Sequence, residues 1–215
     1  MIKQASYFKR RPDLDLTAFH EYWKTRHADV VRKLGGFKRY VQNHTVGDDG
    51  PFDGIAEVWF DDMAAMRATV GSGELANIRA DEANFIDAAS MGTIITTEHV
   101  IIDGAPSANA QKLMALVNRQ PQHEPESFQS LYKDELGPMV KRVPGVDRYV
   151  QGHCRLGIYK TDRTPPYDAV ASIWFSDREA ALASTEMARI AEFERTLFDV
   201  ERLSLGWVNE VEIEL

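Results

Sequence analysis

The sequence predicts an α+β protein made of two tandem ferredoxin-like repeats, each with the element order βαββαβ. The main observation is an internal duplication: the segment 39–44, Arg-Tyr-Val-Gln-Asn-His, returns at 148–153 as Arg-Tyr-Val-Gln-Gly-His. The segment 53–60 returns at 168–175, so the offset between the copies grows from 109 to 115 within a predicted loop. Length changes confined to loops are expected of a duplicated fold. We therefore divide the chain into repeats 1–104 and 105–215.

The first repeat supplies six elements in order. A strand at 2–9 precedes a helix at 16–34, strands at 37–44 and 53–60, a helix at 62–87 that breaks near 71–73, and a strand at 93–102. Asp15 is a suitable N-cap for the first helix, and Pro125 takes the first helical position in the second repeat. Glycines at 35–36 end this helix, and Pro-Gly at 144–145 replaces them.

The first helix carries an apolar stripe that contains one histidine. Phe19, Trp23 and His27 lie on this stripe, which continues through Val30, Val31 and Leu34. The second repeat keeps the stripe as Phe128, Tyr132, Leu136, Met139, Val140 and Val143. His27 is therefore predicted to point inward, and its counterpart Leu136 cannot carry the same chemistry.

The strands alternate between two kinds of face. Gly54, Ala56, Val58 and Phe60 form a small or apolar face that helices should cover, whereas Asp53, Ile55, Glu57 and Trp59 form a mixed face. Tyr40, Gln42 and His44 share one face of the preceding strand and recur as Tyr149, Gln151 and His153. We expect them to join the mixed face and to line a barrel that holds a small molecule.

Composition narrows the classes of partner and compartment. The 215 residues carry a net charge of −8, with lysine and arginine scattered singly, which argues against nucleic acid and anionic membranes as partners. No apolar run approaches the roughly 20 residues of a membrane span, and the N-terminus lacks the pattern of a signal peptide, so we expect a cytoplasmic protein. Cys154 is the single cysteine and is expected to be inert.

Four segments of the first repeat resemble the EthD family. They are the residues 19–28, 39–44, 52–60 and 81–87, and the second repeat follows the same pattern more loosely. The resemblance implies a dimeric α+β barrel, in which two ferredoxin-like units pack sheet to sheet; here one chain would form the pseudo-dimer. That superfamily includes monooxygenases without metal or flavin, isomerases, polyketide dehydratases and decarboxylases, and haem enzymes, so the fold does not settle the reaction.

The resemblance implies that His27, in the motif Trp-x-x-x-His-Ala, is a catalytic acid or base. A buried imidazole without full partners costs about 1–3 kcal/mol, a cost that leucine avoids, so its presence favours a function over a core histidine bonded to one carbonyl. Histidine can exchange a proton near neutral pH. The counterpart of Glu57 in the other repeat is Ser172, so Glu57 differs between the repeats as His27 does and is the predicted catalytic partner.

A second group of residues is predicted to bind the substrate. Its members are Tyr40, Gln42, His44, Asp53, Trp59, Trp23, Trp174 and Tyr149. Each also has a structural interpretation: the Tyr-Gln-His series persists in both repeats, Asp168 repeats Asp53, and tryptophans commonly pack cores. We expect neither a metal nor haem, because no close pair of ligands accompanies His27, and no glycine-rich phosphate loop follows a strand.

The sequence thus favours a cofactor-independent enzyme of the lyase or isomerase type, with His27 and Glu57 acting on a small aromatic, lactone or polyketide-like molecule. A cofactor-free monooxygenase using the same pocket is the first alternative, and a binding or stress-response protein without turnover is the second. A homodimer is compatible with each of these three interpretations.

Overall fold

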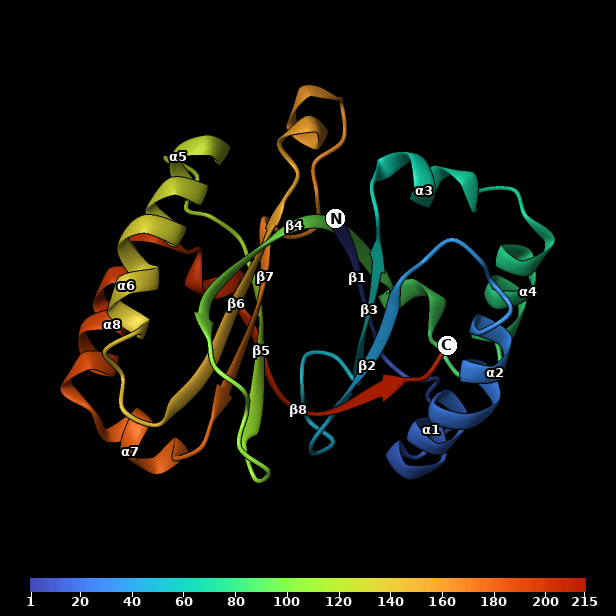
Figure 1. Cartoon of the computed structure of the whole chain (residues 1–215), viewed down its shortest axis with the longest axis horizontal. Coiled ribbons are helices and arrows are strands. Elements are labelled where there is room, and N and C mark those ends of the chain that lie inside the picture. Colours follow the sequence, from blue (N-terminus) through green and yellow to red (C-terminus); the bar gives the residue numbers. More distant parts are fainter. The chain divides into compact units, whose positions relative to one another are not determined.

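The computed structural model describes residues 1–215 and divides into two compact units. The first unit comprises Met1–Ile95 with Asn209–Leu215 (Figure 1). Its elements are β1 (Ile2–Phe8), α1 (Leu16–Tyr22), the π-helical segment η1 (Trp23–His27), α2 (Ala28–Val31), β2 (Arg39–Thr45), β3 (Gly54–Phe60), α3 (Met63–Ala68), α4 (Gly73–Glu82), the 3-10 turn η2 (Ala88–Ser90) and the start of β4 (Gly92–Asp103). These elements confirm the predicted order.

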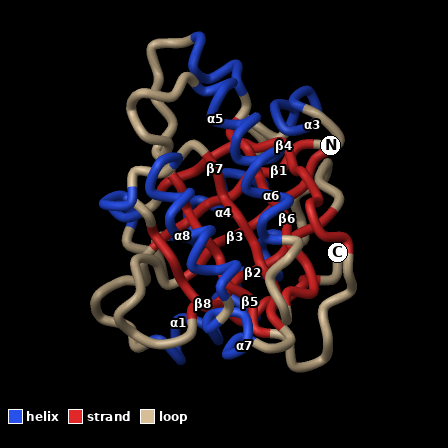
Figure 2. Tube along the Cα trace, turned by 90° about the vertical axis from the view of Figure 1, so that its left-hand side faces the viewer, coloured by secondary structure: helices blue, strands red, loops and turns tan.

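The second unit, Thr96–Val208, repeats this order. It contains β5 (Gln111–Val117), α5 (Pro125–Leu131), the π-helical η3 (Tyr132–Leu136), α6 (Gly137–Val140), β6 (Val146–Cys154), the 3-10 turn η4 (Leu156–Lys160), β7 (Ala169–Phe175), α7 (Arg178–Ala183), α8 (Thr185–Leu197), the 3-10 turn η5 (Val200–Arg202) and β8 (Ser204–Ile213). Figure 2 shows α6 and α8 lying across the strands of this unit. The repeats meet at residue 104 in the sequence, whereas the compact units divide within β4 and β8.

The strands of each unit pair antiparallel, in the order β1-β3-β2 in the first unit and β8-β5-β7-β6-β4 in the second, which confirms the predicted fold class of two ferredoxin-like halves. In the first unit β3 lies between β1 and β2, and Ala56 is opposite both Ser6 and Gln42. Helices cover the face that carries Ala56 and Val58, as predicted (Figure 1). No helix is long and apolar enough to cross a membrane.

A π-helical segment interrupts the first helix of each repeat, and the sequence interpretation missed it. Phe19, Trp23, His27 and Val31 recur every four residues and are all buried. On a regular α-helix a spacing of four rotates each successive side chain by about 40° away from one face. The wider π turn at 23–27 removes this drift and keeps the stripe together. The second repeat has the same spacing and the same segment.

Local signals in the sequence account for the helix ends. The Asp15 side chain accepts a hydrogen bond from the Ala18 N–H, as its N-cap assignment predicts. Pro125 is the first residue of α5. Gly36 and Gly145, which follow the helices, have φ angles of 90° and 72°, a conformation in which a β-carbon would be strained. The caps fix where each helix begins, and the glycines fix where the chain turns from the helix toward the next strand.

Candidate active site

His27 is held by a hydrogen-bonded group of side chains from two helices. The last residue of η1 is His27, and its Nδ1 lies 2.8 Å from Oδ2 of Asp81 on α4. The other carboxylate oxygen of Asp81 accepts hydrogen bonds from the Tyr22 hydroxyl at 2.8 Å and from Nδ2 of Asn84 at 3.1 Å. The ring of Phe85 packs against the imidazole at 4.8 Å between centroids. His27 is thus fixed in orientation by a carboxylate that is itself fixed.

The charges in this group define which nitrogen of His27 can react. Burial opposes ionisation of Asp81, but hydrogen bonds from His27, Tyr22 and Asn84 outweigh it and lower the Asp81 pKa. An ionised carboxylate can only accept a hydrogen bond, so Nδ1 of His27 carries the hydrogen and Nε2 holds the free electron pair. Burial lowers the His27 pKa despite the opposing effect of Asp81. At neutral pH the side chain is therefore a neutral imidazole that can accept a proton at Nε2.

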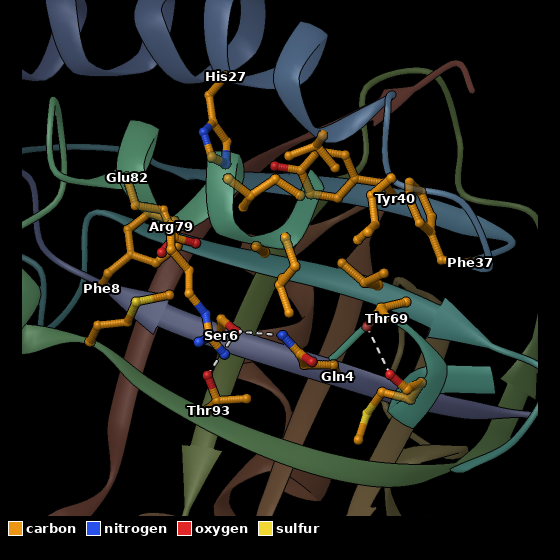
Figure 3. A pocket seen from close by; sticks show the side chains of 18 of the residues that line it. Gln4, Ser6, Phe8, His27, Phe37, Tyr40, Thr69, Arg79, Glu82 and Thr93 are labelled. Atoms are coloured by element: carbon orange, nitrogen blue, oxygen red, sulfur yellow. Dashed lines mark hydrogen bonds between the residues drawn. The ribbon is translucent and has the colours of Figure 1, made fainter. Parts of the chain in front are cut away.

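A cavity of about 520 Å³ lies in the first unit between the sheet and the helices. His27 points into it from the helix side, and Gln4, Ser6 and Thr93 line the opposite wall (Figure 3). Ser6 Oγ lies 2.9 Å from Thr93 Oγ1 and accepts a hydrogen bond from the Gln4 amide at 3.3 Å. Most other lining residues are apolar, among them Phe8, Trp23, Val31, Phe37, Val58 and Ile78. An apolar cavity with a few polar groups is typical of a small-molecule site.

Two charged residues of α4 complete the cavity. Glu82 and Arg79 both line the cavity, and Figure 3 shows both side chains below His27. Burial raises the Glu82 pKa, the nearby Asp81 carboxylate acts in the same direction, and Arg79 partly opposes them. The cavity therefore contains a neutral base and a carboxyl group that retains its proton more readily than usual. Sequence reasoning missed both Asp81 and Glu82, although the segment 81–87 had been matched to the family's second helix.

The second repeat has lost this polar group as a set. At its own offsets of 109 and 112, His27 becomes Leu136, Asp81 becomes Phe193 and Tyr22 becomes Leu131. The polar wall changes in the same way, with Leu113, Ala115 and Leu205 at the positions of Gln4, Ser6 and Thr93. The carboxyl group persists, because Glu194 stands at the position of Glu82, and so does the tyrosine, because Tyr149 stands at the position of Tyr40. The asymmetry predicted for His27 extends to the network that holds it.

The Tyr-Gln-His series supports the π segment, and its expected place on the mixed face is wrong. The Gln42 amide donates to the Trp23 carbonyl at 2.8 Å and to the Tyr40 hydroxyl at 3.1 Å, while its oxygen lies 2.9 Å from Nε2 of His44. Gln42 is opposite Ala56 in the sheet, so the series shares the helix-covered face. Gln151 makes the same bonds to Tyr132, Tyr149 and His153. Of the first series, Tyr40 alone lines the cavity.

Glu57 is not the partner of His27. It lies on β3 next to Ala56 and Val58, so its side chain leaves the sheet on the opposite face. There Glu57 accepts hydrogen bonds from Nζ of Lys3 at 2.6 Å and from Nδ2 of Asn43 at 3.0 Å. The error arose because asymmetry between repeats was taken as a sign of contact, whereas two asymmetric positions can lie on different faces.

The remaining predicted site residues fall into four places. Trp23 lines the first cavity and its Nε1 donates to Tyr40 at 3.0 Å, while Tyr149 lines a separate cavity in the second unit. Trp59 and Trp174 lie on the sheet face away from these cavities, beside the cations Arg39 and Lys112 respectively. Asp53 accepts a hydrogen bond from the Arg10 N–H at 2.8 Å, and Asp168 makes the equivalent bond to Arg119. This repetition fits a structural role at the strand start.

The structure contains no cluster of three or more His, Cys, Asp or Glu side chains arranged to hold a metal ion. Burial raises the pKa of the Cys154 thiol to about 11, so this cysteine is a poor nucleophile and a poor ligand at neutral pH. The expectation that no cofactor is needed stays a prediction.

Residues 11–89 match the family model of the EthD domain. The first repeat is therefore similar to an EthD domain. The matched range includes His27 and Glu82, which line the cavity from the helix side, and Tyr22 and Asp81, which hold His27 in place. Gln4 and Thr93 lie outside the matched range. No curated protein matches the sequence.

Solved structures share the fold over almost the whole chain at low sequence identity. An anthrone oxidase-like protein gives a TM-score of 0.66 at 10% identity and covers 100% of this chain and 93% of its own. A candidate monooxygenase from Lactobacillus acidophilus NCFM gives 0.58 at 12% identity, with coverages of 98% and 94%. A mutant chlorite dismutase from Candidatus Nitrospira defluvii gives 0.56 at 8% identity, with coverages of 97% and 91%. The region that matches the EthD model is thus part of a chain whose two-repeat fold is similar to that of these proteins.

Proposed function

We propose that the first unit is the active site of an oxygen-consuming oxidoreductase that acts on a small aromatic or polyketide-like compound. The observation that carries the proposal is the Tyr22–Asp81–His27 network, which presents a neutral imidazole nitrogen to a cavity of about 520 Å³. Cavities of about 300–1,000 Å³ suit drug-sized ligands, so two or three fused rings fit. The loss of the whole network in the second repeat supports a chemical role, because a core histidine needs no such set.

The reaction begins with transfer of a substrate proton to Nε2 of His27. The Asp81 carboxylate stabilises the imidazolium that forms, and Tyr22 and Asn84 keep that carboxylate in place. The substrate is left as a phenolate or enolate, whose charge Arg79 and the hydroxyls of Ser6 and Thr93 can stabilise. Such an electron-rich anion is able to reduce O₂. For an activated methylene the balance is CH₂ + O₂ → C=O + H₂O, with the substrate supplying all four electrons.

The descriptions of the structural neighbours favour this reaction class over others. One neighbour is described as anthrone oxidase-like and another as a candidate monooxygenase. Both likenesses lie at the level of the fold, so they support the proposal by analogy. The geometry of the cavity in this chain supports it independently.

A second candidate is proton transfer without oxygen, as in isomerisation, dehydration or decarboxylation. The presence of Glu82 favours it, because a protonated carboxyl in the same cavity as a neutral histidine gives a general acid and a general base. Both candidates begin with the same proton transfer, and oxygen consumption separates them.

The test uses the purified protein with a panel of anthrones, polyhydroxylated aromatics and lactones, followed by an oxygen electrode and mass spectrometry. The variant is His27→Leu, the residue of the second repeat, and the matched control is His99→Leu in the second unit. The proposal is supported by oxygen uptake that yields a product about 14 mass units heavier than the substrate, the change from CH₂ to C=O, when His27→Leu but not the control loses this activity. Turnover without oxygen uptake supports the second candidate. Binding that survives His27→Leu with no product would show a protein without turnover, and haem absorption in the visible spectrum would overturn the cofactor-free chemistry.

A further inference from the structure

The second unit has a cavity of its own, at the position that corresponds to the first. Its volume is about 180 Å³, and it lies between the strands β5, β6, β7 and β8 and the helices α6 and α8. Aliphatic and aromatic side chains form nearly all of its wall, among them Leu113, Leu136, Ile173, Phe175, Ile190 and Phe198. A dry apolar cavity of about 150 Å³ is large enough to hold benzene. The volume here therefore admits a molecule with one aromatic ring.

Glu194 is the one charged residue in this wall. Glu194 is partly buried, no hydrogen bond or ion pair to its carboxyl group is present in the structure, and burial alone raises its pKa. A carboxyl group in such surroundings is costly unless a partner is supplied. Most other polar positions of the first cavity, among them those of Ser6, His27 and Thr93, have become apolar in the second, yet Glu194 remains where the first has Glu82. Its retention indicates that its partner comes from outside the chain.

The state of this carboxyl group decides what it can bind. Burial raises the Glu194 pKa to about 7, so a large share of the group is protonated at neutral pH and acts as a hydrogen-bond donor. The titratable groups that face it are the phenols of Tyr132 and Tyr149, whose own pKa values burial raises, so both stay neutral. No cation lines the cavity. A neutral ligand with an acceptor oxygen avoids bringing a second charge into apolar surroundings, which a cationic amine would require.

We propose that the second unit binds a neutral, single-ring aromatic molecule with one hydrogen-bond acceptor, and that Glu194 donates to that acceptor. The ring fills the apolar wall and the carboxyl group fixes its orientation. This site is separate from the catalytic cavity and does not depend on the reaction proposed for it.

Methionine methyl groups distinguish the two cavities by nuclear magnetic resonance. Met187 lines the second cavity, whereas Met66 and Met91 line the first. Protein labelled with ¹³C at the methionine methyl groups is titrated with acetophenone, with ethylbenzene of nearly the same shape but no oxygen, and with benzylamine. We expect acetophenone to shift the Met187 signal with an affinity about 3- to 10-fold higher than that of ethylbenzene, the effect of one neutral hydrogen bond.

Variants of Glu194 separate its hydrogen bond from its charge. Glu194→Gln keeps a donor and should keep the preference for acetophenone, whereas Glu194→Leu should abolish it. Ala115→Phe should fill the second cavity and remove the Met187 shift, and its repeat counterpart Ser6→Phe is the control that fills the first cavity. If Ala115→Phe does not fold, the wild-type Met187 shift still localises the ligand. A Met187 signal that no probe moves, tighter binding of benzylamine than of acetophenone, or an acetophenone preference that survives Glu194→Leu would each overturn the proposal.

Discussion

Replacing His27 by leucine should make the protein relatively more stable in acid. The His27 side chain is 5% exposed, and burial lowers its pKa below the usual 6.5, so the folded protein holds it neutral. An unfolded chain takes up a proton on this histidine below pH 6.5, and the folded chain does so only at lower pH. The stability contributed by the neutral form is therefore complete above pH 6.5 and is lost as the pH falls below it.

The size of this effect has an upper limit that follows from the usual histidine pKa. If the folded protein keeps His27 neutral down to pH 5.5, protonation of the unfolded chain costs about 1.4 kcal/mol at that pH and almost nothing at pH 7.5. At pH 7.5 the variant loses a hydrogen bond to Asp81, worth about 1.5–3 kcal/mol, and gains apolar burial of about 1.5–3 kcal/mol. These changes offset one another, so we expect similar stabilities at pH 7.5 and an advantage of about 1 kcal/mol for the variant at pH 5.5.

Urea unfolding of both proteins at several pH values between 5.5 and 7.5 measures this difference. The other histidines are common to both proteins and cancel in the comparison. His99→Leu is the matched control; the His99 pKa is also lowered by burial, but this side chain is more exposed, so its pH effect should be smaller. A wild-type protein that gains stability relative to His27→Leu as the pH falls would show that Asp81 holds a charged imidazolium. His27 could not then act as the base.

Three further changes test the structure around the site. A β-carbon at Gly54 would lie 2.5 Å from the Trp23 ring, so Gly54→Ala should destabilise the protein by about 1–3 kcal/mol in urea unfolding. Adding Trp23→Tyr, which gives the pair of residues found in the second repeat, should restore part of the lost stability. Fully additive effects of the two substitutions would refute the contact. Asp81→Asn should remove the preference of His27 for a proton on Nδ1, which ¹⁵N spectra of the imidazole report; an unchanged tautomer would contradict the assignment. Gln42→Leu should cost about 1–3 kcal/mol, because the Trp23 carbonyl loses its side-chain donor; a neutral result would remove the proposed support of the π segment.

Most of the fold was predictable because the same pattern occurs twice. Strand positions followed from the duplicated segments 39–44 and 53–60, and the helix ends followed from Asp15 and Pro125. The π segment was not recognised, although the spacing of four from Phe19 to Val31 contained the signal. A spacing of four is common on ordinary helices, and it becomes diagnostic only when three successive intervals keep it and all members are buried.

The candidate site was predictable in part. His27 was found because one repeat has leucine where the other has histidine, a difference that is visible without any structure. Asp81 could have been found by the same comparison, since Phe193 stands at its counterpart, but the register between the second helices rests on gaps in a loop and was read only from 85 onward. Glu57 was predicted as the partner instead. Alternation along a strand tells which of its side chains share a face, but only the pairing register tells which faces of neighbouring strands coincide.

The differences between the repeats are coordinated, and physical chemistry explains why they must be. A buried network that keeps some of its members leaves polar groups unpaired, which is worse than either a complete network or an apolar core. Loss of His27 alone would leave Asp81 with fewer donors, and loss of Asp81 alone would leave a buried imidazole without an acceptor. The second repeat accordingly has apolar residues at all three positions of the network, Leu131, Leu136 and Phe193. Glu194 departs from this pattern, because an unpaired carboxyl group remains in a wall that has no other charged residue. Glu194 therefore persists for a reason separate from the His27 network, and a ligand that supplies its missing partner provides that reason.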